Sequence, residues 1–166
     1  MRQFLNENSA ALLLIAIGVF LALQVWEYRR RPKALAILGV VVVVIGAGYW
    51  QARGGPSNIA RAAELDALVA TGRPVLLEAY SDTCIACLVS RPTVDGLERD
   101  LAGTAGFVRV NVRDEVGRGL VRRFGIRATP TFVVFGPNGE EVYRQDGGLA
   151  DGDRLRDTLT RPGGTD

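Results

Sequence analysis

The residues of this chain best suited to chemistry are its two cysteines, Cys84 and Cys87, which are separated by Ile85 and Ala86. They follow a β-type run over residues 75–80 and stand where a helical pattern begins. A helix start favours a thiolate, because its free N–H groups and the positive end of its dipole lower a cysteine pKa from about 8.5 to between roughly 3.5 and 7.5. One thiol of such a pair can face outward to attack a disulfide, and the other can resolve the mixed disulfide.

Composition excludes several other kinds of site. The 166 residues include no histidine, so neither a histidine base nor a histidine metal ligand is available. Two cysteines cannot complete a four-ligand zinc site without unusual carboxylate help. The net charge of +2 is too small to indicate a nucleic-acid partner. We therefore expect neither a metal nor a nucleic acid.

Helical and strand patterns alternate around the cysteines after residue 57. The run over 75–80 is apolar except for Glu78, as in a strand covered on both faces. Pro92 must bend the helix that follows the cysteines. Ser57 or Asn58 can cap a helix over 59–70. The other predicted elements are strands over 107–112, 131–135 and 141–145, and helices over 116–124 and 150–159.

Two long apolar runs in the first 50 residues predict a membrane hairpin. Residues 10–26 have one polar residue, Gln24, in 17 positions, and residues 34–50 have no charge in 17 positions. Each run is at the short end of the roughly 17 to 25 residues that cross a hydrocarbon core of about 30 Å. Trp and Tyr residues close both runs, as is common at the level of lipid headgroups. The loop over 27–33 is basic at four of its seven positions.

A cleaved signal peptide is the main alternative for the first run. Against it, Arg2 is offset by Glu7, no A-x-A cleavage site precedes the loop, and arginines follow the run. A buried soluble hairpin fits less well, because too little protein remains to cover two apolar helices. The positive-inside rule places the loop in the cytoplasm and both termini on the other side. We expect a two-pass protein of a bacterial-type cytoplasmic membrane, with the rest of the chain extracytoplasmic, where disulfides form.

Several spaced features together resemble the thioredoxin-like thiol-disulfide oxidoreductases. They are the C-x-x-C after a buried strand, Pro92, Thr129-Pro130-Thr131 before the next sheet hairpin, Asn138-Gly139 in its turn and Gly147-Gly148 before the last helix. The resemblance covers about residues 58–161. It implies an α/β, thioredoxin-like fold with a central mixed sheet flanked by helices, preceded here by the two-helix transmembrane hairpin.

The expected domain organisation follows from these features. Residues 1–33 hold the first transmembrane helix and the cytoplasmic basic loop, and residues 34–50 hold the second transmembrane helix. Residues 51–57 are a short linker, flexible by its Gly-Gly-Pro content. Residues 58–166 form the thioredoxin-like domain.

The resemblance implies roles for individual residues. Cys84 is similar to the family's nucleophile and Cys87 to its buried resolving thiol, so a redox-active Cys84–Cys87 disulfide serves in place of a cofactor. A purely structural disulfide is a poor alternative, because closing so short a loop removes little chain entropy. Pro130 resembles the family's catalytic cis-proline, although sequence alone predicts a trans bond. Thr129 would offer backbone groups to a substrate strand, and Thr83 takes the substrate-side position where the family most often has tryptophan.

Glu78 is the most informative polar residue of the predicted strand. It stands six residues before Cys84, where the family usually has a buried acid. Burial disfavours the charged form and raises the pKa of a carboxyl group, which suits Glu78 to exchange a proton with Cys87. The alternative is a glutamate that faces solvent at a sheet edge. Arg109, where many relatives have lysine, either tunes this acid or is solvated at the surface.

The pair between the cysteines bears on the direction of electron flow. Ile85-Ala86 lacks the Gly-Pro of general thioredoxins and the Pro-His of strong oxidants, and it is similar to the aliphatic pairs of membrane-anchored reducing relatives. With less to stabilise a Cys84 thiolate, the dithiol is expected to reduce protein disulfides. A disulfide-forming oxidase and a non-catalytic redox-sensing adaptor at the membrane are the alternatives.

The expected partners follow from what the hairpin lacks. The two apolar runs contain no cysteine, histidine or acidic residue, so they cannot carry electrons across the bilayer. The hairpin is therefore an anchor in membrane lipid. The partners are protein dithiol or disulfide substrates and a separate membrane redox protein that recycles the dithiol.

Overall fold

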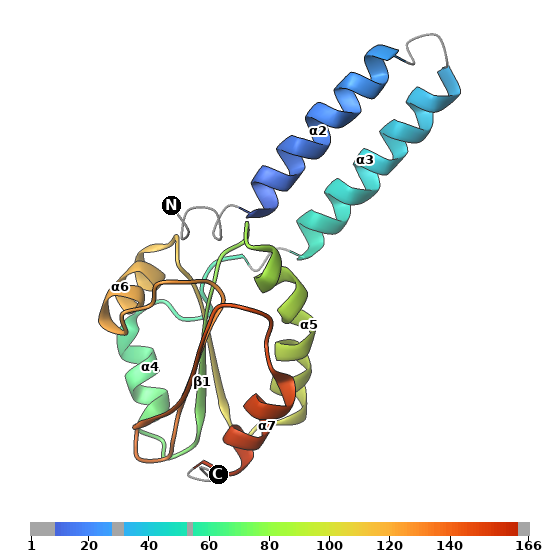
Figure 1. Cartoon of the computed structure of the whole chain (residues 1–166). Helices are drawn as coiled ribbons and strands as arrows, with labels where there is room; N and C mark the ends of the chain where they lie inside the picture. Colours follow the sequence, from blue (N-terminus) through green and yellow to red (C-terminus); the bar gives the residue numbers. More distant parts are fainter. Residues whose placement is uncertain (1–8, 28–31, 53–54, 163–166) are drawn as a thin grey trace.

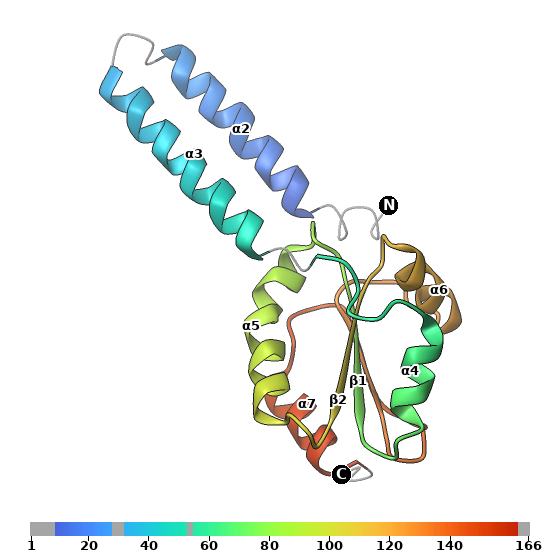
Figure 2. The same ribbon diagram turned by 180° about the vertical axis from the view of Figure 1, so that it is seen from behind.

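The computed structural model describes residues 9–27, 32–52 and 55–162, and the part from residue 55 onward is a sheet between two layers of helices (Figure 1). In chain order the elements are α2 (Ser9–Glu27), α3 (Pro32–Ala52), α4 (Ala62–Val69), β1 (Val75–Tyr80), α5 (Ile85–Asp100), β2 (Gly106–Asn111), α6 (Glu115–Arg123), β3 (Thr131–Phe135), β4 (Glu141–Asp146) and α7 (Gly152–Thr160). Figure 2 shows from behind that α4 and α6 lie on one side of the sheet and α5 and α7 on the other.

The four strands have the order β2-β1-β3-β4, which places β1 inside the sheet. β1 pairs in parallel with β2 and antiparallel with β3, and β3 and β4 form an antiparallel hairpin. The sheet is therefore mixed, as the resemblance implies. All six residues of β1 are buried, which explains why its sequence is almost continuously apolar instead of alternating.

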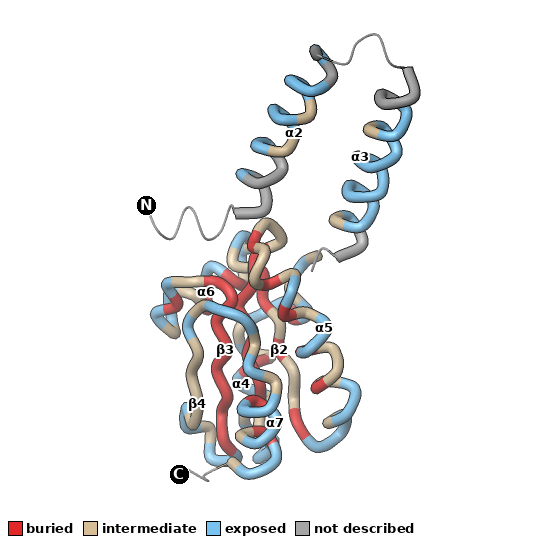
Figure 3. Tube along the Cα trace, turned by 45° about the vertical axis from the view of Figure 1, so that its right-hand side comes forward, coloured by how far each residue is buried: buried red, intermediate tan, exposed pale blue. Residues whose placement is uncertain are grey.

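Alternate residues of the strands supply two hydrophobic cores, one on each face of the sheet. The core beneath α4 and α6 includes Leu65, Leu77, Ala79, Val110, Leu120 and Val133. The core beneath α5 and α7 includes Leu76, Val94, Leu97, Phe132, Val134 and Leu155. Figure 3 shows β3 as buried throughout, whereas β4 at the edge of the sheet is only partly buried. None of the described residues of α2 and α3 belongs to either core, so residues 55–162 make up a domain with its own interior.

Most predicted elements agree with the structure. β1 and β3 span the predicted residues, and β2, β4 and α6 agree within one residue at each end. α5 runs through Pro92 as a single helix of 16 residues. α7 begins at Gly152, two residues later than predicted, because Asp151 is its N-cap and accepts a hydrogen bond from the backbone N of Arg154.

The start of α4 differs more. The helix begins at Ala62 instead of residue 59, and its N-cap Arg61 makes no side-chain hydrogen bond to it. The predicted caps bond elsewhere: Ser57 Oγ donates to Asp114 Oδ2 at 2.6 Å, and Asn58 N donates to the backbone oxygen of Arg109 at 3.0 Å. The two polar residues that the local pattern assigns to the helix cap thus form hydrogen bonds with residues far away in the sequence.

α2 and α3 lie side by side as an antiparallel pair that extends from one end of the domain (Figures 1 and 2). Large apolar side chains are exposed along both helices, among them Ile15, Phe20, Leu23, Val40, Val44 and Trp50. Within the residues that the structure describes, no helix combines the length and the apolar character needed to span a membrane. Most of the basic loop predicted at 27–33 lies outside the described residues.

Candidate active site

The two cysteines lie where β1 ends and α5 begins. Cys84 is the N-cap of α5, with an extended backbone (φ −96°, ψ 116°), and its Sγ accepts a hydrogen bond from the backbone N of Cys87 at 3.4 Å. The Cys84 N–H donates to Ser81 O at 3.1 Å. Both thiols are free. The predicted position of Cys84 at a helix N-terminus is confirmed.

The two thiols have opposite pKa shifts. The hydrogen bond from the Cys87 thiol is the largest cause that lowers the pKa of Cys84 to about 6, and backbone N–H groups of Cys87 and Ala86 add to it against the opposing effect of burial. The same bond between the two sulfurs, followed by burial, raises the pKa of Cys87. At neutral pH Cys84 is therefore the thiolate and Cys87 keeps its proton. Disulfide exchange needs this division between an attacking and a resolving thiol.

Cys84 is less accessible than the sequence indicates. Its exposed fraction is 0% and that of Cys87 is 4%, so neither thiol faces outward. Cys84 Sγ lies 3.4 Å from the carbonyl oxygen of Thr129, to which the thiol donates when it is protonated. The expectation of an outward-facing Cys84 is wrong for this conformation, because the sulfur is directed at the Thr129 carbonyl and at the start of α5.

The loop before β3 lies against the dithiol. The Thr129–Pro130 peptide bond is cis, as the resemblance implies. Thr129 is buried and its carbonyl oxygen contacts Cys84, so its contact with a substrate strand stays a prediction, as does a catalytic role for Pro130.

Thr83 is held by a residue that sequence reasoning missed. Its hydroxyl accepts a hydrogen bond from Arg113 Nη2 at 2.8 Å and lies 3.2 Å from Ser81 Oγ. Arg113 follows β2 and reaches the dithiol loop from there. No spacing or motif in the sequence connects these positions. The substrate-binding role of Thr83 stays a prediction.

Glu78 is a buried acid, and the alternative of a solvated glutamate at the sheet edge is wrong. Its exposed fraction is 2%, and burial is the largest cause that raises its pKa. Arg109, its neighbour in register on β2, opposes this shift, since Arg109 Nε donates to Glu78 Oε2 at 2.7 Å. The same guanidinium donates to Asp95 Oδ1 of α5 at 2.5 Å. Arg109 is thus bound to the acid and is not solvated freely at the surface.

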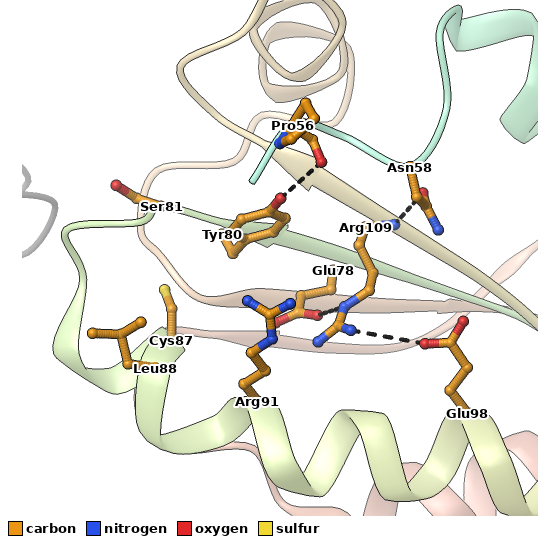
Figure 4. Close-up of a pocket in the computed structure, with 10 residues that line it drawn as sticks. All are labelled: Pro56, Asn58, Glu78, Tyr80, Ser81, Cys87, Leu88, Arg91, Glu98 and Arg109. Carbon is orange, nitrogen blue, oxygen red and sulfur yellow. Dashed lines mark hydrogen bonds and ion pairs between the residues drawn. The ribbon is translucent and has the colours of Figure 1, made fainter. Parts of the chain in front are cut away.

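A cavity of about 240 Å³ is lined by both Glu78 and Cys87. Figure 4 shows these two side chains between the sheet and α5, with Arg109 and Arg91 beside the carboxylate. The Glu78 charge is also among the causes that raise the pKa of Cys87. Glu78 and Cys87 thus border the same cavity, and proton exchange between them stays a prediction. In the part of the chain that the structure describes, no three Cys, Asp or Glu side chains are grouped to hold a metal ion.

Residues 55–58, which we call the strap, lead from the hairpin to α4 and are fixed to the domain. Tyr80 Oη donates to Gly55 O at 2.9 Å, and Asn111 N donates to Ser57 Oγ at 2.9 Å. Asn58 exchanges hydrogen bonds with the backbone of Arg109, since Arg109 N donates to Asn58 Oδ1 at 2.9 Å. Residues 55–57 of the predicted flexible linker are therefore bound to β1 and β2. Their only signal in the sequence was the polar pair that we interpreted as helix caps.

Comparisons with known proteins agree with this geometry. The family model Thioredoxin matches residues 57–161. The chain is 33% identical over 76 residues to thioredoxin of Haemophilus influenzae, which covers 46% of this chain and 68% of that protein. It is 29% identical over 152 residues to thiol:disulfide interchange protein DsbD 1 of Pseudomonas aeruginosa, over 84% of this chain and 26% of the relative. It is 26% identical over 119 residues to a thiol:disulfide interchange protein TxlA homolog of Synechocystis sp., over 68% of this chain and 66% of the relative.

A solved structure gives the same result for the fold. Thioredoxin of Fasciola hepatica matches with a TM-score of 0.52 and 30% identity, over 61% of this chain and 94% of that chain. The chain spans between 26% and 66% of the length of the first curated relatives that it matches. The family match begins at residue 57, after α2 and α3.

Proposed function

Since the chain belongs to the thioredoxin family, we propose that it is a membrane-anchored, extracytoplasmic thiol-disulfide oxidoreductase that reduces protein disulfides through Cys84 and Cys87. The observation that carries this proposal is the pair of opposed pKa shifts at the start of α5, which leaves one thiolate and one protonated thiol at neutral pH. The names of the relatives, which include thiol:disulfide interchange proteins, support the same chemistry.

In the proposed cycle the Cys84 thiolate attacks one sulfur of a substrate disulfide. A bond forms between Cys84 Sγ and that sulfur, and the other substrate sulfur leaves as a thiolate. Cys87 then loses its proton to the Glu78 carboxylate and attacks Cys84 Sγ, which closes the Cys84–Cys87 disulfide and releases the second substrate thiolate. One released thiolate takes the proton from Glu78 and the other takes one from water. Two electrons have then passed from the dithiol to the substrate.

The pKa of Cys84 supports the reducing direction. When the attacking cysteine has a pKa of about 3.5, its thiolate is very stable. This stability favours the reduced dithiol form, so the disulfide form is a strong oxidant. The value of about 6 for Cys84 lies nearer to the value of about 7 that goes with a reducing dithiol. The aliphatic Ile85-Ala86 pair adds no further donor side chain to the Cys84 sulfur.

The proposed anchor is the α2–α3 pair, in a bacterial-type cytoplasmic membrane. Exposed apolar side chains run along both helices of this pair. In water-soluble proteins, exposed apolar residues are normally scattered singly. The four basic residues between Glu27 and Ala34 favour a loop in the cytoplasm, which would leave both termini and the domain on the outer side. Lipid then covers the helices, and a separate membrane protein supplies electrons to the dithiol.

The reduction potential of fragment 55–166 tests the direction, because both hydrophobic cores lie within it. A value near about −270 mV supports the reductant, and one near about −120 mV supports the oxidase instead. Turnover of insulin disulfides that is lost in Cys84→Ser would exclude the non-catalytic adaptor. Labelling of Cys84 in intact cells by a membrane-impermeant maleimide tests the compartment, and a chain labelled only after lysis would contradict it.

A further inference from the structure

The dithiol lies at the end of the domain from which the hairpin extends. Figures 1 and 2 show, from opposite sides, the loop between β1 and α5 at the base of α2 and α3. The contact is direct, because Tyr49 in the last turn of α3 donates its hydroxyl to Asp82 O at 3.1 Å. Asp82 stands two residues before Cys84. The anchor therefore touches the loop that carries the nucleophile.

The strap holds the same loop through the Asp82 carboxylate. Gly55 N donates to Asp82 Oδ1 at 3.2 Å, and Asn111 Nδ2 donates to both Asp82 Oδ2 and Gly55 O at 2.9 Å. Gly55 is three residues beyond the end of α3, so the strap binds the dithiol loop at its first described residue. Asp82 is thus bound by the hairpin through its carbonyl and by the strap through its carboxylate. Together these bonds hold the dithiol loop against the base of the hairpin and the strap.

Cys84 has no exposed surface in this arrangement, although it caps a helix at the end of the domain. Exchange therefore requires the dithiol loop to move away from the Thr129 carbonyl, and the Tyr49–Asp82 hydrogen bond is one of the contacts that hold this loop in place. A protein that packs against α2 and α3 in the same membrane already lies beside the Tyr49–Asp82 contact and is placed to open it.

We propose that the base of the hairpin and the loop over residues 81–84 form one docking face, and that its partner is a membrane protein that presents a cysteine pair at the bilayer surface. This inference rests on the proposed anchoring and exchange activity. The exposed apolar side chains of α2 and α3 lie at the same end of the domain as the dithiol. Tyr49 and Trp50, at the end of α3, are residue types that favour the headgroup level.

The test uses the reduced full chain in phosphatidylcholine vesicles and two pyridyl disulfide probes. One probe is attached to the headgroup of phosphatidylethanolamine in the same vesicles, and the other to soluble dextran. The measured quantity is the ratio of the thiopyridone release rates, lipid-borne over dextran-borne. A Tyr49→Phe variant with a flexible Gly-Ser insertion of about 12 residues after Arg53, which spans roughly 19 Å, should lower this ratio on the order of tenfold.

Tyr143→Phe is the matched control. It also removes one tyrosine hydroxyl, which hydrogen-bonds to Gln145 Oε1 at 3.2 Å on β4, and it should leave the ratio unchanged. Equal ratios in the wild type and the insertion variant would overturn the proposal, and fast reaction of both with the dextran probe would indicate a soluble partner. Failure of the exchange function itself gives a different result, since Cys84 of fragment 55–166 would then not react even with small dipyridyl disulfide. If the chain does not float with the vesicles, both the anchor and this inference are wrong.

Discussion

The pH dependence of Cys84 reactivity follows directly from the geometry at the start of α5. Reduced fragment 55–166 would be mixed with dipyridyl disulfide between about pH 4 and pH 9, and thiopyridone release followed by absorbance. Only the thiolate attacks, so the rate should rise with pH and reach half of its plateau near the Cys84 pKa of about 6. An ordinary cysteine would still be gaining rate at about pH 8.5.

The size of the effect depends on pH, because a low pKa increases the thiolate fraction but weakens each thiolate as a nucleophile. At pH 7 a pKa of about 6 gives roughly 30 times more thiolate than a pKa of about 8.5. A Brønsted slope of about 0.45 lowers the intrinsic rate roughly 13-fold, which leaves an advantage of only about twofold. At pH 5 the same reasoning gives an advantage of roughly 20-fold. The comparison with an ordinary thiol is therefore decisive at acid pH.

Two variants of Cys87 test the cause of the low Cys84 pKa. Cys87→Ala removes the thiol donor and leaves the backbone N–H groups, so the pKa of Cys84 should rise and the midpoint should move to higher pH. Cys87→Ser keeps a donor at the same position, so its midpoint should stay closer to 6. A midpoint near 8.5 in the wild-type fragment, or equal midpoints in the two variants, would refute the reasoning.

The other predictions concern Glu78, Arg109 and a close contact in α6. Glu78→Gln should slow resolution of a mixed disulfide on Cys84 by about 100-fold or more in stopped-flow measurements, and unchanged rates across pH would remove its catalytic role. Burial raises the pKa of Glu78 in the folded protein above its unfolded value of about 4.3, so the acid lowers the stability of the fold as pH rises through this range. In urea unfolding between about pH 4 and pH 8, Glu78→Gln should therefore become more stable relative to wild type as pH rises. The total gain should be about 1.4 kcal/mol for each pH unit between the folded and the unfolded pKa. Arg109→Met leaves the buried carboxylate without its partner and should destabilise the fragment by about 3 kcal/mol or more, and adding Glu78→Gln should recover most of this loss. Gly117→Ala would place a Cβ 1.8 Å from Asn111 O and should lower the free energy of unfolding by more than about 3 kcal/mol. Gly119→Ala in the same helix meets open space and should raise it by about 0.5 to 1 kcal/mol. Similar thermal midpoints for the two variants would contradict the packing of α6 on β2.

The sequence predicts an element correctly where its local pattern of residues reflects burial in the fold. β1 is predicted correctly because an inner strand covered on both faces is apolar throughout, and Glu78 is conspicuous there as the one exception. The N-cap position of Cys84 follows from the order of strand, short polar residues and helix. These features need only neighbouring residues to be recognised.

The features that the sequence did not predict depend on contacts between distant residues. Ser57 and Asn58 are plausible helix caps until Asp114 and the backbone of β2 are placed beside them. The burial of Cys84 depends on Thr129, 45 positions later in the chain. Asp82 and Tyr49 belong to no motif, and their contact exists only because the hairpin ends beside the dithiol loop.

The most direct test of disulfide exchange by this chain is to trap its intermediate. The full chain carrying Cys87→Ala would be produced in a bacterium, and its membranes would be quenched with acid and separated without reductant. Disulfide-linked adducts should form through Cys84, disappear on treatment with dithiothreitol and be absent when Cys84→Ser is added to the same chain. If no adduct forms, or if adducts persist without Cys84, the chain does not exchange disulfides in the way proposed.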